Sequence, residues 1–314
     1  MNSKATKFGI ELLHPRHWVS WFVFAIWWLV SQLPFPALLT LGKGLGLLAF
    51  QFKTSRKSIA ERNIQLCFPQ LDAQQRQTLL RRNFINLGIA IMEIGIAWWW
   101  SRKRFSKLLH IDGAENLCLT NSEGILLLGI HYTTLEIGAA AASTAHDRVD
   151  GMYRAHRNKV YDYLQARGRI SKSCGNSIVY ERKDVRGSLK ALKSGRILWY
   201  GPDQDYGLGS GLFAPLFGIQ AATVHTTARF AHMSGAKVVP FNHIRLDGNR
   251  GYQVTFYPPI ENFPSGDDLR DATTVNEIIE DFIMLKPDQY LWVHRRFKTR
   301  PQDEEDFYTT SSGS

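Results

Sequence analysis

The stretch G-I-L-L-L-G-I-H-Y-T-T-L-E, residues 124–136, decides the fold. Residues 124–130 form a continuous apolar run, which is typical of a short strand buried on both faces. Residues 133–144 continue with helical spacing, so His131 is expected in the turn between strand and helix. Open α/β sheets bind ligands at the carboxyl ends of their strands, which makes this turn the first candidate site.

Segments with strand and helix patterns alternate from residue 111 onward. Strands are expected at 150–154, 177–181, 196–201, 237–242 and 252–258. Helices are expected at 160–169, 185–194, 224–233 and 274–284. Residues 55–100 also have helical periodicity, with a break at Pro69. The alternation predicts the α/β class, with a central mixed sheet flanked by helices.

The N-terminal region is unusually apolar and aromatic. Residues 17–52 contain Lys43 as their only formal charge apart from His17, and Trp18, Trp21, Trp27 and Trp28 lie close together. About 20 apolar residues span a bilayer as a helix, and clustered Trp is typical of its interface. Because Pro34 and Pro36 interrupt the run, it is expected either to span once or to lie on the membrane as two helices. A buried core helix is the alternative.

We divide the chain accordingly into a membrane-anchoring segment at 1–54, a main domain at 55–308 and a disordered tail at 309–314. The 314 residues are 44% hydrophobic and 21% charged, as in a folded protein, and carry a formal net charge of +10. This charge favours an anionic partner, such as nucleic acid, anionic lipid or an acidic protein. The three cysteines form no CxxC pair, which indicates a reducing compartment without disulfides or a zinc cluster.

The best candidates for chemistry are His131 and Glu136. A carboxylate in the first helical turn can hold one ring nitrogen of a preceding histidine and leave the other nitrogen free to accept a proton. The alternative is structural, because Thr133-x-x-Glu136 also has the form of a capping box. The spacing alone leaves both readings open.

Further polar residues follow the next buried strand and the segments between. Asp203 and Asp205 lie in Y-G-P-D-Q-D-Y-G, residues 200–207, where they either position a partner or form an ordinary turn. Arg154, Arg169 and Arg182 are candidates for binding phosphate or carboxylate, with a solvated surface as the alternative. The chain has no G-x-S-x-G, no G-x-x-x-x-G-K-[ST] and no common zinc spacing, so no cofactor and no metal are predicted.

Taken together, these residues resemble the late (secondary) acyltransferases of bacterial lipid A biosynthesis, the lauroyl and myristoyl transferases, within the wider glycerophosphate-type acyltransferases. The resemblance runs from about Trp18 to Pro301, and H-x-x-x-x-E at 131–136 matches the family signature. Other matching blocks follow in order: M-Y-R-A-H-R-N (152–158), V-Y-D-Y-L-Q (160–165), G-R (168–169), E-R-K-D (181–184), P-D-Q-D-Y-G (202–207) and Q-Y-L-W-V-H-R-R-F-K-T-R-P (289–301). The chain departs from the family at 155–157, where Pro-x-x-Asn is usual and Ala-His-Arg-Asn stands.

The resemblance implies a bacterial inner-membrane enzyme whose catalytic domain faces the cytoplasm. Acyl carrier protein would donate a fatty acyl chain to the hydroxyl of a hydroxyacyl chain on a Kdo-bearing lipid A precursor. His131 would be the general base, Glu136 would orient it, and Arg169 would donate to the oxyanion or to a phosphate. Arg154 and Arg182 would bind substrate, while Asp203 and Asp205 organise the second turn.

Two other functions remain open from the sequence. The same base could activate water, which would make the protein an acyl-thioester hydrolase. A basic, non-catalytic module that binds membrane lipid is the other alternative. Nucleic acid is not an expected partner, because the basic residues accompany a lipid-seeking N-terminus and no recognition helix is evident.

Overall fold

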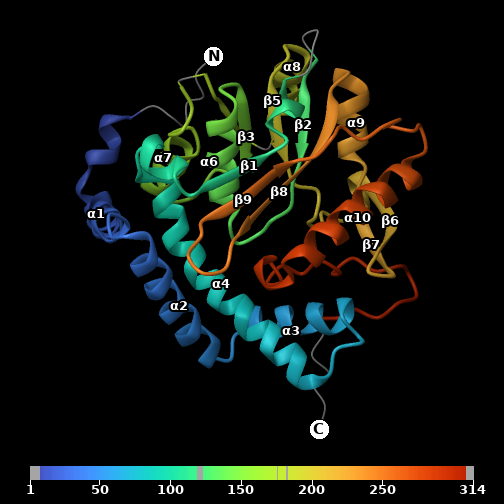
Figure 1. The fold of residues 1–314 in the computed structure, drawn as a ribbon. Coiled ribbons are helices and arrows are strands. Elements are labelled where there is room, and N and C mark those ends of the chain that lie inside the picture. The colour runs from blue at the N-terminus through green and yellow to red at the C-terminus, as the bar shows by residue number, and fades with distance from the viewer. Residues whose placement is uncertain (1–7, 119–122, 175, 182, 309–314) are drawn as a thin grey trace.

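A computed structural model describes residues 8–118, 123–174, 176–181 and 183–308. Within these ranges the chain forms a seven-stranded sheet in the order β1-β9-β8-β2-β5-β3-β4, with helices on both faces (Figure 1). Neighbouring strands are parallel except β8 and β9, whose antiparallel pairing makes β9 and β1 run opposite to the other five strands. The prediction of an α/β fold with a mixed central sheet flanked by helices is confirmed.

The strands lie close to the predicted segments. Two features were not predicted: the edge strand β1 and a separate hairpin of β6 and β7. The bounds are β1 (Leu109–Asp112), β2 (Ile125–Leu128), β3 (Val149–Tyr153), β4 (Val179–Glu181), β5 (Ile197–Tyr200), β6 (Gly211–Leu216), β7 (Ile219–Val224), β8 (Lys237–Arg245) and β9 (Tyr252–Phe256).

The helices include every one expected from the spacing, and Pro69 does separate α3 from α4. The bounds are α1 (Trp18–Ser31), α2 (Phe35–Gln51), α3 (Ser55–Cys67), α4 (Ala73–Trp99), α5 (Arg102–Ser106), α6 (Leu135–Ala145), α7 (Lys159–Arg169), α8 (Val185–Lys193), α9 (Thr226–Ser234) and α10 (Asp268–Leu285). Short 3-10 turns occupy Ile10–Leu13, Pro15–His17, Ala114–Leu117, Leu208–Ser210 and Pro287–Gln289.

The strand β2 explains why its sequence is apolar throughout. It lies between β5 and β8, so neither edge is free. Ile125 and Leu127 join the core packed against α4 and α6, whereas Leu126 and Leu128 join the core under α9 and α10. Because both faces are covered, every residue of the strand is buried and no polar alternation is possible.

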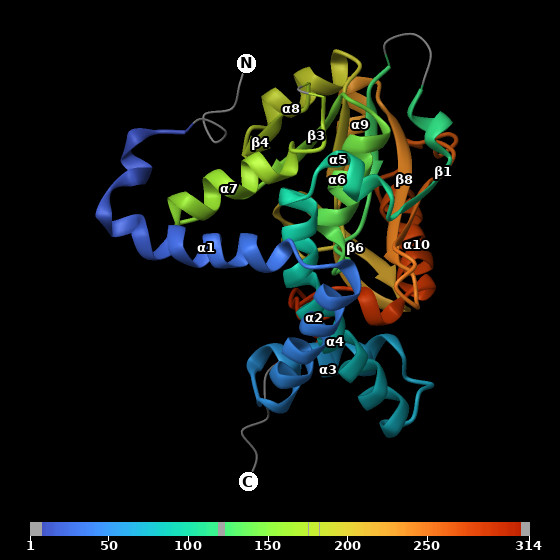
Figure 2. The ribbon, with the colours of Figure 1, turned by 60° about the vertical axis from the view of Figure 1, so that its left-hand side comes forward.

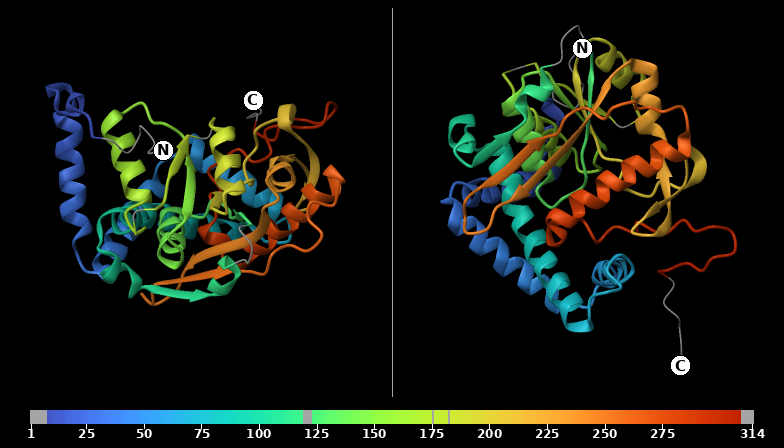
Figure 3. Two further views of the ribbon diagram at one scale, coloured as in Figure 1. Left: turned by 90° about the horizontal axis from the view of Figure 1, so that it is seen from above. Right: turned by 45° about the vertical axis from the view of Figure 1, so that its right-hand side comes forward.

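The N-terminal region forms two helices, α1 and α2, rather than one. Among the described residues no single helix is both long and apolar enough to cross a bilayer, although α2 and α3, which meet at a 92° bend, would suffice together by length and composition. Helix α1 lies at the side of the molecule next to α7 (Figure 2 and Figure 3, left). The proposed boundaries at 54 and 308 stay predictions, and the tail 309–314 lies outside the described residues.

Large apolar side chains on α1 and α2 face solvent. One side of α1 packs on the protein, where Trp27 contacts Trp98 and Trp99. The other side is open, with Val19 75% and Phe22 67% exposed. The exposed apolar residues of the two helices, here called the apolar stripe, are Trp18, Val19, Phe22, Val23, Ile26, Trp28, Leu29, Leu41, Leu45 and Leu48.

Glycines bring α2 and α4 into direct backbone contact. A Cβ on Gly46 would lie 2.3 Å from the Phe84 carbonyl oxygen, and one on Gly88 would lie 2.3 Å from that of Gly42. The G-K-G-L-G run at 42–46, which has no phosphate-loop context, therefore serves helix packing. Such small residues permit the close approach of two helix backbones.

We expect Gly46→Ala to destabilise the protein and Gly44→Ala to stabilise it, as measured by thermal unfolding. The added methyl at residue 46 meets backbone atoms, which costs about 1–3 kcal/mol of overpacking. A Cβ at residue 44 meets nothing within 4 Å, so its better helix propensity contributes about 0.5–1 kcal/mol. Equal effects of the two substitutions on the melting temperature would contradict the packing role.

Candidate functional site

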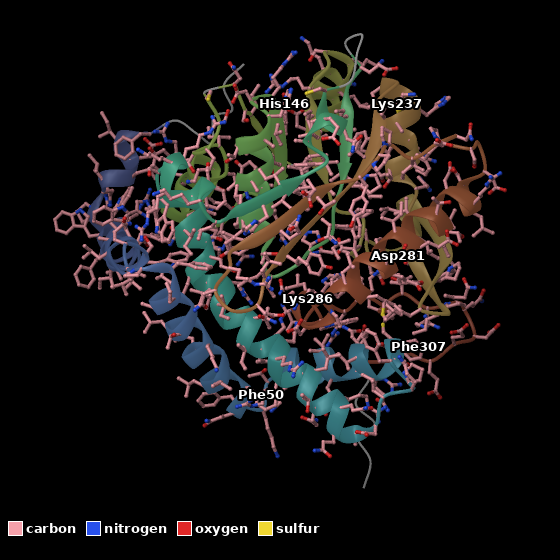
Figure 4. The ribbon with its side chains drawn as sticks, viewed as in Figure 1. Phe50, His146, Lys237, Asp281, Lys286 and Phe307 are labelled. Carbon is pink, nitrogen blue, oxygen red and sulfur yellow. The ribbon has the colours of Figure 1, made fainter. Side chains whose placement is uncertain are left out.

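The candidate site lies at the carboxyl ends of β2 and β5. These parallel strands pair with Leu128 opposite Tyr200, and His131 and Asp203 each stand three residues further along. Figure 4 labels His146, just before β3, and Lys237, the first residue of β8, at the opposite end of the sheet, where β2 and β5 lie between them. The strand register alone thus carries His131 and Asp203 to the same end of the sheet.

A single carboxylate holds His131 at two points. Asp203 Oδ1 lies 2.6 Å from the ring Nδ1, and Oδ2 accepts a hydrogen bond of 2.9 Å from the backbone N–H of His131. Burial by itself raises the pKa of Asp203, whose side chain is 1% exposed, but the charge and hydrogen bonds of His131 lower it below the ordinary value. Asp203 is therefore an ionised acceptor, which leaves the ring Nε2 for another partner.

Glu136 bonds to other side chains than predicted. Its Oε1 accepts from Arg169 Nη2 at 2.5 Å, and its Oε2 accepts from Trp98 Nε1 at 2.9 Å. The prediction was that Glu136 would hold the His131 ring, whereas the structure has Asp203 on that ring. The reason is direction, because the ring of His131 faces the neighbouring strand end while Glu136 faces α4 and α7.

The capping-box reading of Thr133 and Glu136 is wrong. Helix α6 begins at Leu135 with Thr134 as its N-cap, and no side chain caps it. The hydroxyl of Thr133 is buried without a hydrogen-bond partner, and that of Thr134 donates to the His243 carbonyl oxygen at 2.8 Å. Neither hydroxyl therefore caps α6, and that of Thr134 serves a contact outside the helix.

A cavity of about 390 Å³ opens beside His131. One wall is a face of α6 made of Leu135, Ala139, Ala142 and Ser143, whose spacing of three and four residues places them in line. Further lining residues come from β3, β5 and α7, and include Met152, Tyr153, Arg154, Arg169 and Trp199. The cavity combines a long apolar wall with a histidine and two arginines.

Of the predicted site residues, His131, Arg154 and Arg169 line this cavity. Glu136 and Asp203 lie behind Arg169 and His131, respectively. Asp205 holds the C-terminal segment instead, because its carboxylate accepts from the backbone N–H of Thr299 at 2.8 Å. Arg182 lies outside the described residues.

Two tryptophans and a glycine of the site were not predicted. The Trp199 ring meets the His131 ring edge to face, with centroids 5.5 Å apart, and Trp98 donates to Glu136. A Cβ on Gly201 would lie 2.9 Å from Cε1 of His131, so a side chain there would displace the ring. The dense aromatic residues at 98–100 and the Gly at the end of the predicted strand 196–201 were visible in the sequence, but nothing there indicated what they touch.

The C-terminal segment 286–300 packs against the backbone of the turn that contains His131. Leu291 donates its backbone N–H to the His131 carbonyl oxygen at 3.0 Å. Amides of Asn63 and Asn83, on α3 and α4, donate in turn to the carbonyls of Trp292 and Tyr290, each at 2.7 Å. Parts of the chain that are far apart in sequence thereby fix the backbone of His131.

His243 lies behind the site and is 1% exposed. Its Nδ1 stands 2.9 Å from the Thr134 hydroxyl, and its Nε2 is buried without a hydrogen-bond partner. Burial, together with the nearby His131, lowers the pKa of His243 from 6.5 to about 3. The ring is therefore neutral at physiological pH.

Comparison with known proteins identifies close relatives over nearly the whole chain. The family described as "Bacterial lipid A biosynthesis acyltransferase" matches residues 5–299. The chain is 42% identical to the lipid A biosynthesis lauroyltransferase of Escherichia coli K12, over 94% of this chain and 96% of that protein. It is 38% identical to the lipid A biosynthesis palmitoleoyltransferase of the same strain, over 96% of this chain and 98% of that protein.

A solved structure gives a weaker likeness. The 1-acyl-sn-glycerophosphate acyltransferase PlsC of Thermotoga maritima is 14% identical, with a TM-score of 0.36 over 67% of this chain and 87% of that one. Similarity at this level adds nothing to the strand order described above.

The buried neutral ring of His243 predicts acid sensitivity. Because its folded-state pKa lies below the unfolded value, the unfolded chain takes up the proton first, so the stabilisation is complete above pH 6.5 and is lost as the pH falls towards 3. His243→Gln should reduce the slope of unfolding free energy against pH between pH 6 and 4 by up to about 1.4 kcal/mol per unit. Denaturant titrations at several pH values measure this slope. His232→Gln, at an exposed position, should keep the wild-type slope.

Proposed function

Since this chain belongs to the bacterial lipid A biosynthesis acyltransferase family and is therefore an acyltransferase, we propose its donor and acceptor. Acyl carrier protein donates a fatty acyl chain as a thioester. The acceptor is the hydroxyl of a hydroxyacyl chain on a Kdo-bearing lipid A precursor. Both molecules are anionic, which suits a chain with a formal net charge of +10.

The observation that carries this proposal is a histidine beside an elongated apolar wall, with one of its two ring nitrogens already hydrogen-bonded. His131 is engaged at Nδ1 by Asp203 and lines the cavity with Leu135, Ala139 and Ala142. An apolar wall suits an acyl chain, and a neutral imidazole with a free Nε2 suits the deprotonation of a hydroxyl. The cavity thus offers a place for the chain and a base for the nucleophile.

In the proposed reaction, His131 Nε2 takes the proton of the acceptor hydroxyl while its oxygen bonds to the thioester carbonyl carbon. The tetrahedral intermediate then collapses, the carbon–sulfur bond breaks, and the proton on Nε2 passes to the departing thiolate. The products are an ester and a free thiol. No covalent bond to the protein forms at any step.

Arg169 and Arg154 have separate places in this scheme. Arg169 uses its Nε, Nη1 and Nη2 on Glu136 and the Met152 carbonyl, and a guanidinium has five N–H groups, so two remain. These two suit the developing oxyanion. Arg154 is exposed at the cavity and suits a phosphate or carboxylate of a substrate. We propose Arg182 as a second residue that binds a phosphate or carboxylate of a substrate.

We place the protein at the bacterial inner membrane, with its catalytic domain facing the cytoplasm. The apolar stripe on α1 and α2 supports this, because so many large side chains in water would be costly and lipid would cover them. Tryptophans on α1 and the basic residues Arg16 and Lys53 at the ends of the two helices suit a headgroup layer.

Replacement of His131 by alanine should lower acyl transfer by about 10²–10⁴-fold with an unchanged fold, since this is what a positioned general base contributes. The assay uses acyl carrier protein thioester with the lipid A precursor, and mass spectrometry of the lipid measures the ester. His110→Ala, on the edge strand β1, is the matched control and should retain full activity.

The same assay without lipid acceptor separates transfer from hydrolysis. Ester formation that depends on the acceptor, with little free fatty acid, supports the transferase. Release of fatty acid at the same rate with or without acceptor would instead identify a thioester hydrolase. Normal ester formation by a folded His131→Ala protein would rule out His131 as the base.

The triple variant Trp18→Ser, Phe22→Ser and Leu29→Ser should weaken binding to anionic lipid vesicles by on the order of 1000-fold or more, because each buried side chain contributes about 1.5–3 kcal/mol. Sedimentation with vesicles measures the bound fraction. A matched triple variant removes equally exposed apolar side chains on α9 and α10, at Met233, Leu269 and Met284, and should bind as the wild type does. Equal losses in both variants would contradict a lipid contact at α1.

A further inference from the structure

Two buried carboxylates of the site, Asp203 and Glu136, have different partners. Asp203 contacts His131 alone among the site's charged side chains, through both of its oxygens. Glu136 contacts Arg169 with Oε1 and Oε2 and also accepts from Trp98. Each carboxylate is largely or wholly removed from solvent, at 1% exposure for Asp203 and 11% for Glu136.

The Asp203 contact fixes both the position and the tautomer of the ring. A carboxylate only accepts hydrogen bonds, so at 2.6 Å the proton of a neutral His131 must lie on Nδ1. The lone pair is then on Nε2. The second oxygen holds the backbone N–H of the same residue at 2.9 Å, so the ring and its own backbone are tied to one group.

Asp203 is itself held firmly. Asp203 lies three residues beyond Tyr200, and His131 lies three residues beyond Leu128. Because Leu128 and Tyr200 are paired in the sheet, Asp203 and His131 lie at the same height above it. The Tyr290 hydroxyl donates to the Asp203 carbonyl oxygen at 3.3 Å. A carboxylate fixed by strand register and by the C-terminal segment can orient a base without moving during the reaction.

From this geometry we infer that Asp203 is the positioning residue for His131 in the proposed reaction, and that Glu136 positions Arg169 instead. The inference rests on the proposed function, because it needs His131 as the base. When Nε2 takes the hydroxyl proton, the Asp203 carboxylate stabilises the imidazolium and does not itself become protonated. The Glu136 carboxylate in turn aligns the two remaining N–H groups of Arg169 towards the cavity.

The experiment compares Asp203→Asn with Glu136→Gln. Both remove one negative charge at nearly constant size, so they are matched to each other. An amide at residue 203 can donate to Nδ1, which favours the wrong tautomer, and it no longer stabilises the imidazolium. We expect kcat to fall by roughly 10²–10⁴-fold, and the acid limb of the kcat/KM profile to move to lower pH by about one unit or more.

Glu136→Gln should move that acid limb less than Asp203→Asn does, whatever it does to kcat, because Glu136 does not bond to the His131 ring and acts on it only through the unpaired charge of Arg169. Titratable neighbours of the pair include His243, His294 and Tyr290. They are common to both variants and cancel in the comparison. An acid limb moved by Glu136→Gln and not by Asp203→Asn would overturn the inference.

A measurement on the wild-type protein covers the case in which Asp203→Asn does not fold. Nitrogen-15 NMR of histidine-labelled protein, with His131→Gln to assign the signal, reports the tautomer. A proton on Nδ1 supports the inference, and a proton on Nε2 overturns it.

The His131 variants separate this inference from the proposed function. If His131→Gln keeps normal transfer, His131 is not the base and the proposed mechanism itself fails. If His131→Gln abolishes transfer while Asp203→Asn keeps the wild-type rate and profile, the mechanism stands and only the role of Asp203 is overturned.

Discussion

The parallel pairing of β2 with β5 is the constraint on which the site depends. Two parallel strands must end at the same edge, and a shared register makes residues at equal distance beyond that edge neighbours. The pairing also requires β2 to be covered on both faces, which explains its apolar sequence. The strand pairing that forms the core therefore also brings His131 to Asp203, and no other contact is required to place the two residues side by side.

Buried ion pairs surround this centre. Glu136 pairs with Arg169, Asp150 with Arg196, and Glu93 with Arg245. Each joins elements that are distant in sequence, and loss of one partner in such a pair leaves an uncompensated buried charge, which costs about 3–5 kcal/mol. Burial raises the pKa of Asp150, although the hydrogen bonds and charge of Arg196 counteract it. Two of the pairs reach the cavity, through Arg169 and Asp150, whereas the pair of Glu93 with Arg245 joins α4 to β8.

Local pattern was enough to predict most of the fold. The apolar run at 124–130 and the alternation after it gave the α/β class, because burial on two faces and helical periodicity both leave a direct mark on sequence. The hairpin β6–β7 left a weaker mark, since Ala and Thr at 221–223 are neither clearly apolar nor alternating. The site was predicted as a set of residues but not as a set of contacts. Whether Glu136 or Asp203 meets His131 depends on strand order, which no single stretch of sequence encodes.

Helix α4 contacts both the helices that carry the apolar stripe, α1 and α2, and a carboxylate of the site, Glu136. It touches α2 at Gly88 and holds Glu136, behind the cavity, through a hydrogen bond from Trp98. At 1.5 Å rise per residue these two points lie about 15 Å apart along one unbroken helix. Because α1 also packs on this helix, with Trp27 against Trp98, the apolar stripe and the hydrogen bond to Glu136 are attached to the same rigid element. Under the proposed function, a change in how α1 rests on lipid is therefore transmitted through a single helix to the carboxylate that holds Arg169.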